Sequence, residues 1–189
     1  MSVQERKQRE RAERERLIVG TARELAEQQG WDAVTTRRLS DRVEYSQPVL
    51  YSHFAGKDAI VDAVAVAGIS ELTDRLRAAV AGSAPGREAV GRVARAYLSF
   101  AVEHPAVYQA MFTLTTGLPF ATDEAPAALK ESFAELGKVL NPARHGQDLG
   151  SLTEVFWSTL HGIAVLLANG RMRPEHQEDR VAIVLDLFA

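Results

Sequence analysis

The stretch that decides the fold reads TTRRLSDRVEYSQPVLYSHFAGK and spans residues 35–57. It predicts two short helices joined by a tight turn. A threonine at position 35 or 36 can cap the first helix, because its hydroxyl accepts a backbone N–H group left unpaired in the first turn. Leu39 and Val43 share one face of that helix and are predicted to point inward.

The second helix of this stretch has its own start signal. Ser46 stands where a cap belongs, and Pro48 falls in the first turn, where its missing N–H is no loss. Leu50 and Phe54 are predicted to point inward at helical spacing. A helix this short, with so narrow an apolar face, is predicted to be exposed for contact with a partner. The residues left toward solvent are Gln47, Val49, Tyr51 and Ser52, with Pro48 at the tip.

These exposed side chains suit DNA. Gln47 can pair bidentately with adenine, Arg37 or Arg38 can bind guanine or phosphate, and apolar side chains can touch a thymine methyl group. Hydroxyl, imidazole and ammonium groups are natural phosphate partners. Two-helix corners also occur in proteins that never meet DNA, so the residues alone leave a structural role open. The predicted DNA-binding residues are Thr35, Thr36, Arg37, Arg38, Ser46, Gln47, Pro48, Val49, Tyr51, Ser52, His53 and Lys57.

The stretch resembles the helix-turn-helix of the TetR family of bacterial repressors. The resemblance rests on the Thr-Thr opening, the two inward residues of the first helix, the run Gln47-Pro48-x-Leu50-Tyr51-x-His53-Phe54-x-x-Lys57 and an apolar Ile60 after it. It implies an operator-binding regulator. One departure is the turn, where the family usually has Gly then Val and this chain has Glu44 and Tyr45. A positive φ at Glu44 would cost on the order of 1 kcal/mol relative to Gly.

Length and composition limit the class of protein. The chain has 189 residues, of which 46% are apolar, which is ample for a core in one large domain or two small ones. The absence of cysteine excludes disulfides, thiol nucleophiles and cysteine metal sites. The longest continuous apolar run, residues 162–168, is too short to span a bilayer. We therefore expect a cytoplasmic protein with no membrane partner.

Charge is unevenly distributed along the chain. The net charge is -3, yet residues 1–58 carry 11 Lys and Arg against 10 Asp and Glu. Residues 35–57 carry four basic side chains against two acidic ones. The positive charge lies where DNA binding needs it, and the small excess predicts only a moderate salt dependence per subunit.

Helical periodicity continues on both sides of the motif. An apolar stripe in residues 17–26 predicts a first helix that ends at Gly30. Its Arg-rich beginning, residues 6–16, is either a frayed solvated helix or an arm that reaches phosphates or a minor groove. Trp31 is predicted to plug a small core. A long helix over residues 58–81 contains Gly68, which either permits close helix packing or acts as a hinge.

The rest of the chain also predicts helices and the breaks between them. Helices are expected over residues 87–103, around 107–112, over 125–140, 149–169 and 175–188, with loops at 82–86, 115–124 and 141–146. The fold class is all-α, with about nine helices. We expect a three-helix DNA-binding domain over residues 1–58 and a helical ligand-binding and dimerisation domain over 59–189.

Residues 149–169 differ from the other predicted helices, because apolar residues cover almost the whole circumference. Such a helix needs partners on every side. One side can face its own domain and the other a second copy of the chain. We predict a homodimer in which this helix and the one over 175–188 form a four-helix bundle with their twofold mates. Paired recognition helices about 34 Å apart would then read a palindrome.

The C-terminal part shows a weaker resemblance, to a TetR subtype with a Trp…His-Gly pattern, through Trp157, His161 and Gly162. Trp157 and His161 lie one turn apart and either frame a ligand pocket or belong to a plain core. No phosphate loop, catalytic grouping or metal-ligand spacing is recognisable, so we predict no enzyme activity, no cofactor and no metal. The candidate ligand-binding residues are Tyr97, Tyr108, Met111, Phe112, Phe133, Trp157 and His161.

These observations together predict a ligand-responsive repressor that binds a palindromic operator as a homodimer. A small-molecule effector would release it, a direction implied by the resemblance. Two alternatives stay open, namely a regulator controlled by a protein partner and a helical small-molecule-binding protein that does not bind DNA.

Overall fold

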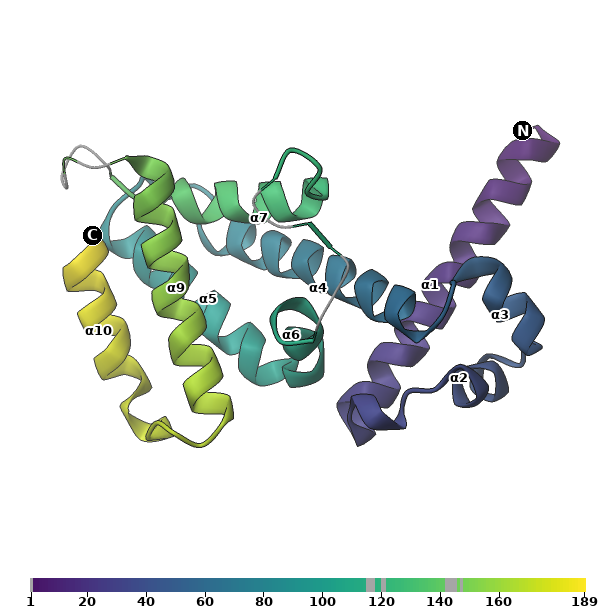
Figure 1. Ribbon diagram of the computed structural model, residues 1–189. Helices are drawn as coiled ribbons and strands as arrows, with labels where there is room; N and C mark the ends of the chain where they lie inside the picture. The colour runs from purple at the N-terminus through teal and green to yellow at the C-terminus, as the bar shows by residue number, and fades with distance from the viewer. Residues whose placement is uncertain (1, 115–117, 120–121, 142–145, 147) are drawn as a thin grey trace. The chain divides into compact units, whose positions relative to one another are not determined.

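The computed structural model describes residues 2–114, 118–119, 122–141, 146 and 148–189 (Figure 1). Within these ranges there are nine α-helices, two short 3₁₀-helices and no strand, which confirms the predicted all-α class. The chain forms two compact units, residues 1–68 with 106–118, and residues 69–105 with 119–189. We call them the N-terminal unit and the C-terminal unit. They are defined by packing, and the functional boundary at residue 58 stays a prediction.

The N-terminal unit is built on a long first helix. Its helices are α1 (Val3–Gln29), α2 (Thr36–Val43), α3 (Gln47–His53), the first part of α4 (Lys57–Ala79) and nearly all of α6 (Pro105–Phe112), with a 3₁₀ turn at Trp31–Ala33. The side chains at its core alternate at helical spacing, which is why local sequence reasoning could find them. The buried core includes Ile18, Leu25, Val34, Leu39, Leu50, Ile60 and Val64.

α1 is one continuous helix that begins before the predicted apolar stripe. The Ser2 hydroxyl accepts a hydrogen bond from the Glu5 N–H at 3.1 Å, and the Glu5 carboxylate accepts one from the Ser2 N–H at 2.7 Å. This reciprocal capping box fixes the start of the helix. Gly30, with φ of 78°, ends the helix as predicted. The Arg-rich segment is therefore helical throughout.

α6 is fastened to α1 by contacts that join residues about 80 positions apart. The Glu27 carboxylate accepts hydrogen bonds from the backbone N–H groups of Ala106 and Val107, both at 3.1 Å. Trp31 is buried, as predicted, and its indole N–H donates to the Ala106 carbonyl at 2.8 Å. One carboxylate thus satisfies two N–H groups that the start of a helix leaves unpaired.

Gly68 lies where α4 meets α6. A Cβ atom added there would overlap with Cγ1 of Val107 and approach the Met111 sulfur to 3.0 Å. The close-packing interpretation of this glycine is therefore confirmed, because an added side chain would force Val107 or Met111 of α6 to shift.

The C-terminal unit contains the second part of α4, α5 (Arg87–Glu103), α7 (Ala127–Gly137), α9 (Leu149–Ala168), a 3₁₀ turn at Pro174–His176, and α10 (Gln177–Phe188). α5 packs against α9 and α10, and α7 packs against α9. The predicted bounds of α5 are confirmed, whereas α7 is shorter than predicted at both ends, with Pro126 before its first residue and Gly137 as its last. Parts of the predicted loops, residues 115–117, 120–121 and 142–145, lie outside the described residues.

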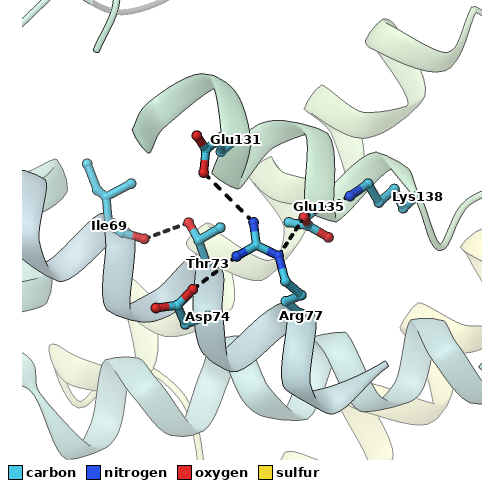
Figure 2. Close-up of polar contacts among 7 residues, drawn as sticks. All are labelled: Ile69, Thr73, Asp74, Arg77, Glu131, Glu135 and Lys138. Atoms are coloured by element: carbon cyan, nitrogen blue, oxygen red, sulfur yellow. Dashed lines mark hydrogen bonds and ion pairs between the residues drawn. The ribbon is translucent and has the colours of Figure 1, made fainter. Parts of the chain in front are cut away.

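A buried carboxylate joins α7 to α4 in the C-terminal unit (Figure 2). Glu135, with 6% of its side chain exposed, accepts hydrogen bonds from Arg77 of α4 at 3.1 Å and from Lys138 at 2.8 Å. Arg77 also pairs with Asp74 at 3.0 Å and with Glu131 at 3.8 Å. Burial by itself raises the pKa of Glu135, but the hydrogen bonds from Lys138 and Arg77 outweigh it and lower the pKa.

α9 is the most apolar of the described helices. Its 20 residues have a mean hydropathy of 1.3, so by length and composition it could cross a membrane, although a core helix of a soluble protein passes the same test. One side of α9 is a core surface, where Leu160 is fully buried and the Phe156 ring meets the Phe188 ring at a tilt of 58°, with centroids 5.1 Å apart. The other side leaves Val155 and Leu166 exposed. The two-sided apolar character predicted for this helix is confirmed.

Candidate nucleic-acid interface

The helix-turn-helix begins with the predicted threonine cap. Thr35 has an extended backbone, and its hydroxyl accepts a hydrogen bond from the Arg38 N–H at 3.2 Å. Leu39 and Val43 of α2 are buried, as their spacing predicted. The cap and the inward face of the first helix of the motif are therefore both as its local sequence predicts.

The turn between the helices uses a non-glycine residue in the left-handed region. Glu44 has φ of 57° and ψ of 34°, and among the described residues other than glycine no other has a positive φ. The backbone N–H of Tyr45 still donates to the Ser40 carbonyl at 3.0 Å, which closes the turn. The Glu44-Tyr45 departure therefore keeps a closed turn and is accommodated by strain of about 1 kcal/mol.

α3 is short and is held by a single fully buried residue, Leu50. Ser46 occupies the cap position, but its hydroxyl makes no capping hydrogen bond and stays exposed. Phe54, predicted to point inward along the helix, follows the last turn of α3 in an extended conformation and is half-buried. With so little apolar anchoring, α3 presents most of its circumference to solvent.

The exposed surface of the motif is polar and accessible. Gln47 and Pro48 are exposed at the start of α3, and Val49 and Tyr51 are 36% and 50% exposed. The side chains of Arg37 and Gln47 make no hydrogen bond to another described residue, so their donors and acceptors are available. The Tyr51 hydroxyl lies 3.4 Å from the Thr36 hydroxyl, which orients the ring across the two helices.

Other predicted DNA-binding side chains hold the motif to its own unit. Arg38 donates to Gln29 at 2.7 Å and to the Ala33 carbonyl at 3.1 Å. Lys57 donates to the Trp31 carbonyl at 2.6 Å. The Ser52 hydroxyl bonds the Val49 carbonyl, and His53, with 5% of its side chain exposed, lies 3.3 Å from Glu15. Phosphate contacts from these side chains stay a prediction.

One residue of this site was missed by the sequence analysis. Arg11 of α1 donates to the Ser52 carbonyl of α3 at 3.3 Å, and its guanidinium pairs with Glu15 at 2.8 Å. The spacing of Arg11 and Glu15 predicts an ion pair along a helix, but nothing local predicts the contact with a residue 41 positions away.

Four of the predicted ligand-binding residues belong to the C-terminal unit. The Trp157 indole N–H donates to the hydroxyl of the buried Tyr97 at 3.0 Å, and the Trp157 and His161 rings lie 6.0 Å apart. Burial lowers the pKa of His161, so its imidazole is favoured in the neutral form. Phe133 is half-buried on α7. The structure therefore brings Tyr97, Trp157 and His161 together.

The other three belong to the N-terminal unit. Tyr108 and Met111 are buried, and the Tyr108 ring meets that of the half-buried Phe112 at 4.9 Å. Two clefts of about 630 and 690 Å³ lie among the described residues, one along α5, α9 and α10 and the other between α1 and α4, and none of the seven candidates lines either. A ligand-binding role for the seven stays a prediction.

Two family models match this chain, one over its N-terminal part and one over its C-terminal part. Residues 18–64 match the model of the bacterial regulatory proteins of the tetR family, which covers α2, the turn and α3. Residues 90–188 match the model of the tetracyclin repressor-like C-terminal domain. The chain belongs to the TetR family. The resemblance inferred from the motif is thereby confirmed, and the chain is a DNA-binding transcriptional regulator by family.

Similar proteins agree with this assignment to the TetR family. The chain is 35% identical over 168 residues to the HTH-type transcriptional regulator YobS of Bacillus subtilis, covering 87% of this chain and 83% of that one. A tetracycline repressor of class C from Escherichia coli is 46% identical over 50 residues, 26% of this chain and 23% of the repressor. The named relatives are regulators of transcription rather than enzymes.

Solved structures share the fold along most of the chain. A protein from Rhodococcus sp. RHA1 matches with a TM-score of 0.75 and 26% identity, covering 92% of each chain. The regulator FadR from Bacillus subtilis, solved in complex with stearoyl-CoA, matches with a TM-score of 0.68 and 12% identity over 89% of this chain and 96% of FadR. α9 lies within residues 90–188, the part of the chain that matches the tetracyclin repressor-like C-terminal domain.

Proposed function

We propose that this TetR-family chain is a cytoplasmic, ligand-responsive repressor that binds a palindromic operator as a homodimer. The observation that carries the proposal is the exposed face of α3, where Gln47 and Tyr51 are presented on a helix anchored by one buried leucine. A glutamine with an unengaged amide can read adenine, and a flanking hydroxyl can bind phosphate.

The exposed apolar side chains of α9 and α10 support a dimer. Val155 of α9 and Ile183 and Leu187 of α10 are each more than half exposed, at 57%, 58% and 57%. Large apolar side chains gathered on a pair of helices mark a protein–protein contact. A twofold partner would bury them in an isologous four-helix bundle and present two recognition helices to one palindrome.

The effector site is proposed to include Tyr97, Trp157 and His161 of the C-terminal unit. These residues combine aromatic surface with a neutral imidazole, a composition that suits an apolar to amphipathic molecule. FadR of Bacillus subtilis carries stearoyl-CoA in its crystal structure, so the shared fold is able to hold a small molecule. Effector binding would favour a geometry that no longer fits both half-sites.

A selection experiment tests the operator assignment. Wild-type protein is used to select duplexes from a random library, and binding of the selected operator is then measured for Gln47→Ala. Loss of a bidentate base contact is expected to weaken binding by about 1–3 kcal/mol, or roughly 5- to 150-fold, and to relax preference at one base pair. Gln109→Ala, an exposed glutamine on α6, is the matched control and is expected to bind as wild type.

Equal operator affinity for Gln47→Ala and Gln109→Ala would show that α3 does not read bases through Gln47. Failure of the wild type to select any duplex would favour the helical binding protein that does not meet DNA. A thermal-shift screen of small molecules separates the remaining alternative, because a regulator controlled by a protein partner would show no ligand-dependent rise in melting temperature.

A further inference from the structure

The first part of α1 extends beyond the core of the N-terminal unit. The buried residues of α1 begin at Ile18, and residues 2–14 are all exposed. A helix polar on all sides is usually stabilised by ion pairs between successive turns. Here Arg6 pairs with Glu10 and Arg9 with Glu13, each at 3.7 Å. Ion pairs along the helix therefore stabilise the first part of α1 in solvent, outside the core of the N-terminal unit.

The buried stripe of α1 continues into this exposed part as basic residues. Leu25 and Ile18, which are fully buried, share a helix face with residues three or four positions away along the chain. Continuing the same face toward the N-terminus at these steps leads to Arg14, Arg11 and Lys7. We call these three residues the basic face of α1. It lies on the side of α1 that covers the core of the unit.

The basic face is fastened beside the recognition helix. Arg11 donates to the Ser52 carbonyl of α3, and Glu15 joins Arg11 to His53 at the end of α3. Figure 1 shows α3 alongside α1, with the first turns of α1 running past it. The guanidinium of Arg11 is used in positioning. Lys7 and Arg14, by contrast, make no ion pair with another described residue.

We propose that the basic face of α1 binds the phosphate backbone of DNA beside the base pairs that α3 reads, with Lys7 and Arg14 as the phosphate-binding residues. The inference rests on the proposed operator binding by α3. A helix rises about 1.5 Å per residue, so Lys7 and Arg14 lie about 10 Å apart along α1, or roughly three base-pair steps of about 3.4 Å. The arm therefore has the length to reach phosphates outside the α3 contact.

The remaining charges of the arm explain why one face is selected. Arg6 and Arg9 point to other sides of the helix, and carboxylates one turn away offset their charges. Lys7 and Arg14, the two cations of the basic face without an ion pair to another described residue, lie on the side of α1 where a duplex bound to α3 would pass. A polyanion bound there gains the release of condensed counterions for each phosphate that a cation neutralises.

The test compares two double variants of the full-length protein on an operator selected by the wild type. K7Q/R14Q removes two charges from the basic face, and R6Q/R9Q removes two charges from the other sides of the same helix. The measured quantities are the slope of log affinity against log salt concentration and the phosphates whose ethylation blocks binding. Circular dichroism checks that both variants keep the helical content of wild type.

For K7Q/R14Q we expect the salt slope to become shallower by about 0.9 per lost phosphate contact, or by about 3 to 4 for a dimer that loses two contacts per subunit. The outermost blocking phosphates should disappear, while base preference is retained. R6Q/R9Q should keep the wild-type phosphate pattern. An unchanged slope and pattern for K7Q/R14Q, or equal losses in both variants, would overturn the proposal. If Gln47→Ala binds as wild type but K7Q/R14Q loses its phosphates, the α3 assignment fails and the arm stands.

Discussion

The helix-turn-helix of the N-terminal unit and the core of the C-terminal unit are each stabilised internally by a different kind of contact. In the helix-turn-helix of the N-terminal unit, α3 buries one residue completely, Leu50, and polar contacts of Arg11 and Arg38 join the motif to α1. In the C-terminal unit, large side chains such as Tyr97, Phe100 and Phe156 fill the core between helices. A helix that contacts DNA must keep most of its surface exposed, so polar contacts at its ends supply the stabilisation that a larger buried face would give.

The largest change in stability is expected at the contact of α4 with α6. At this contact the N-terminal unit, like the C-terminal one, depends on tight apolar packing. Gly68→Ala is expected to destabilise the protein by about 1–3 kcal/mol, since the new methyl group overlaps with Val107 and crowds Met111. Gly20→Ala on α1 is the control. Nothing lies within 4 Å of its added Cβ, and it is expected to stabilise by about 0.5–1 kcal/mol.

Both values come from chemical denaturation followed by circular dichroism. Opposite signs for the two substitutions would sharpen the contrast between a crowded and an open face of the same unit. A neutral Gly68→Ala would show that Val107 and Met111 of α6 yield easily to an added methyl group, and that this contact is not tightly packed.

Glu135 provides the second test, because it forms a polar contact within the C-terminal unit, where apolar side chains fill most of the core. Glu135→Gln is expected to destabilise by about 1 kcal/mol at neutral pH, because it weakens the hydrogen bonds from Arg77 and Lys138. The exposed Glu131→Gln, which removes an ion pair at 3.8 Å, should change stability by less than about 0.5 kcal/mol.

The pH dependence of this pair follows from the direction of the pKa shift. The pKa of Glu135 is lowered from its ordinary value of 4.5, so its stabilisation is present above that pH and is lost as pH falls through the lower, folded-state pKa. The stability difference between wild type and Glu135→Gln should therefore shrink in acid. A difference that stays constant from pH 7 to pH 3 would contradict this role.

The turn of the helix-turn-helix gives the smallest expected effect. Glu44→Gly is expected to stabilise the protein by up to about 1 kcal/mol, because glycine adopts the positive φ of 57° without strain. The same change at Glu24, exposed in the middle of α1, should instead destabilise by about 1 kcal/mol. Thermal melting of the two variants measures both, and a destabilised Glu44→Gly would mean that the carboxylate supports the turn in a way that the backbone strain does not reveal.

Sequence reasoning succeeded where the signal is local. The Thr35 cap, the inward positions of Leu39 and Leu50, the end of α1 at Gly30 and the bounds of α5 each depend on residues within one or two helical turns. Ser46 occupies the predicted cap position of α3 but makes no capping hydrogen bond, and Phe54, predicted to point inward, is only half-buried after the last turn. A helix of 7 residues has too few turns for spacing to say where a side chain at its end will point.

The sequence did not predict which charged side chains are hydrogen-bonded within the protein and which are available. Arg37 and Arg38 are adjacent and look equivalent in sequence, yet Arg38 is bonded to Gln29 and Ala33 while Arg37 is left available. His53, which the motif suggested as a phosphate partner, faces Glu15 of α1. Which of two like residues is engaged depends on what the fold brings beside it.

The sequence by itself determined that this chain is helical, where its motif begins and turns, and which family it resembles, because periodicity, caps and motif spacing act over a few residues. Only the tertiary structure decided that Glu27 and Trp31 fasten α6, that Gly68 must lack a side chain, and that Arg11 holds α1 to α3. Those contacts join residues roughly 40 to 80 positions apart, and their existence depends on the path of the chain between them.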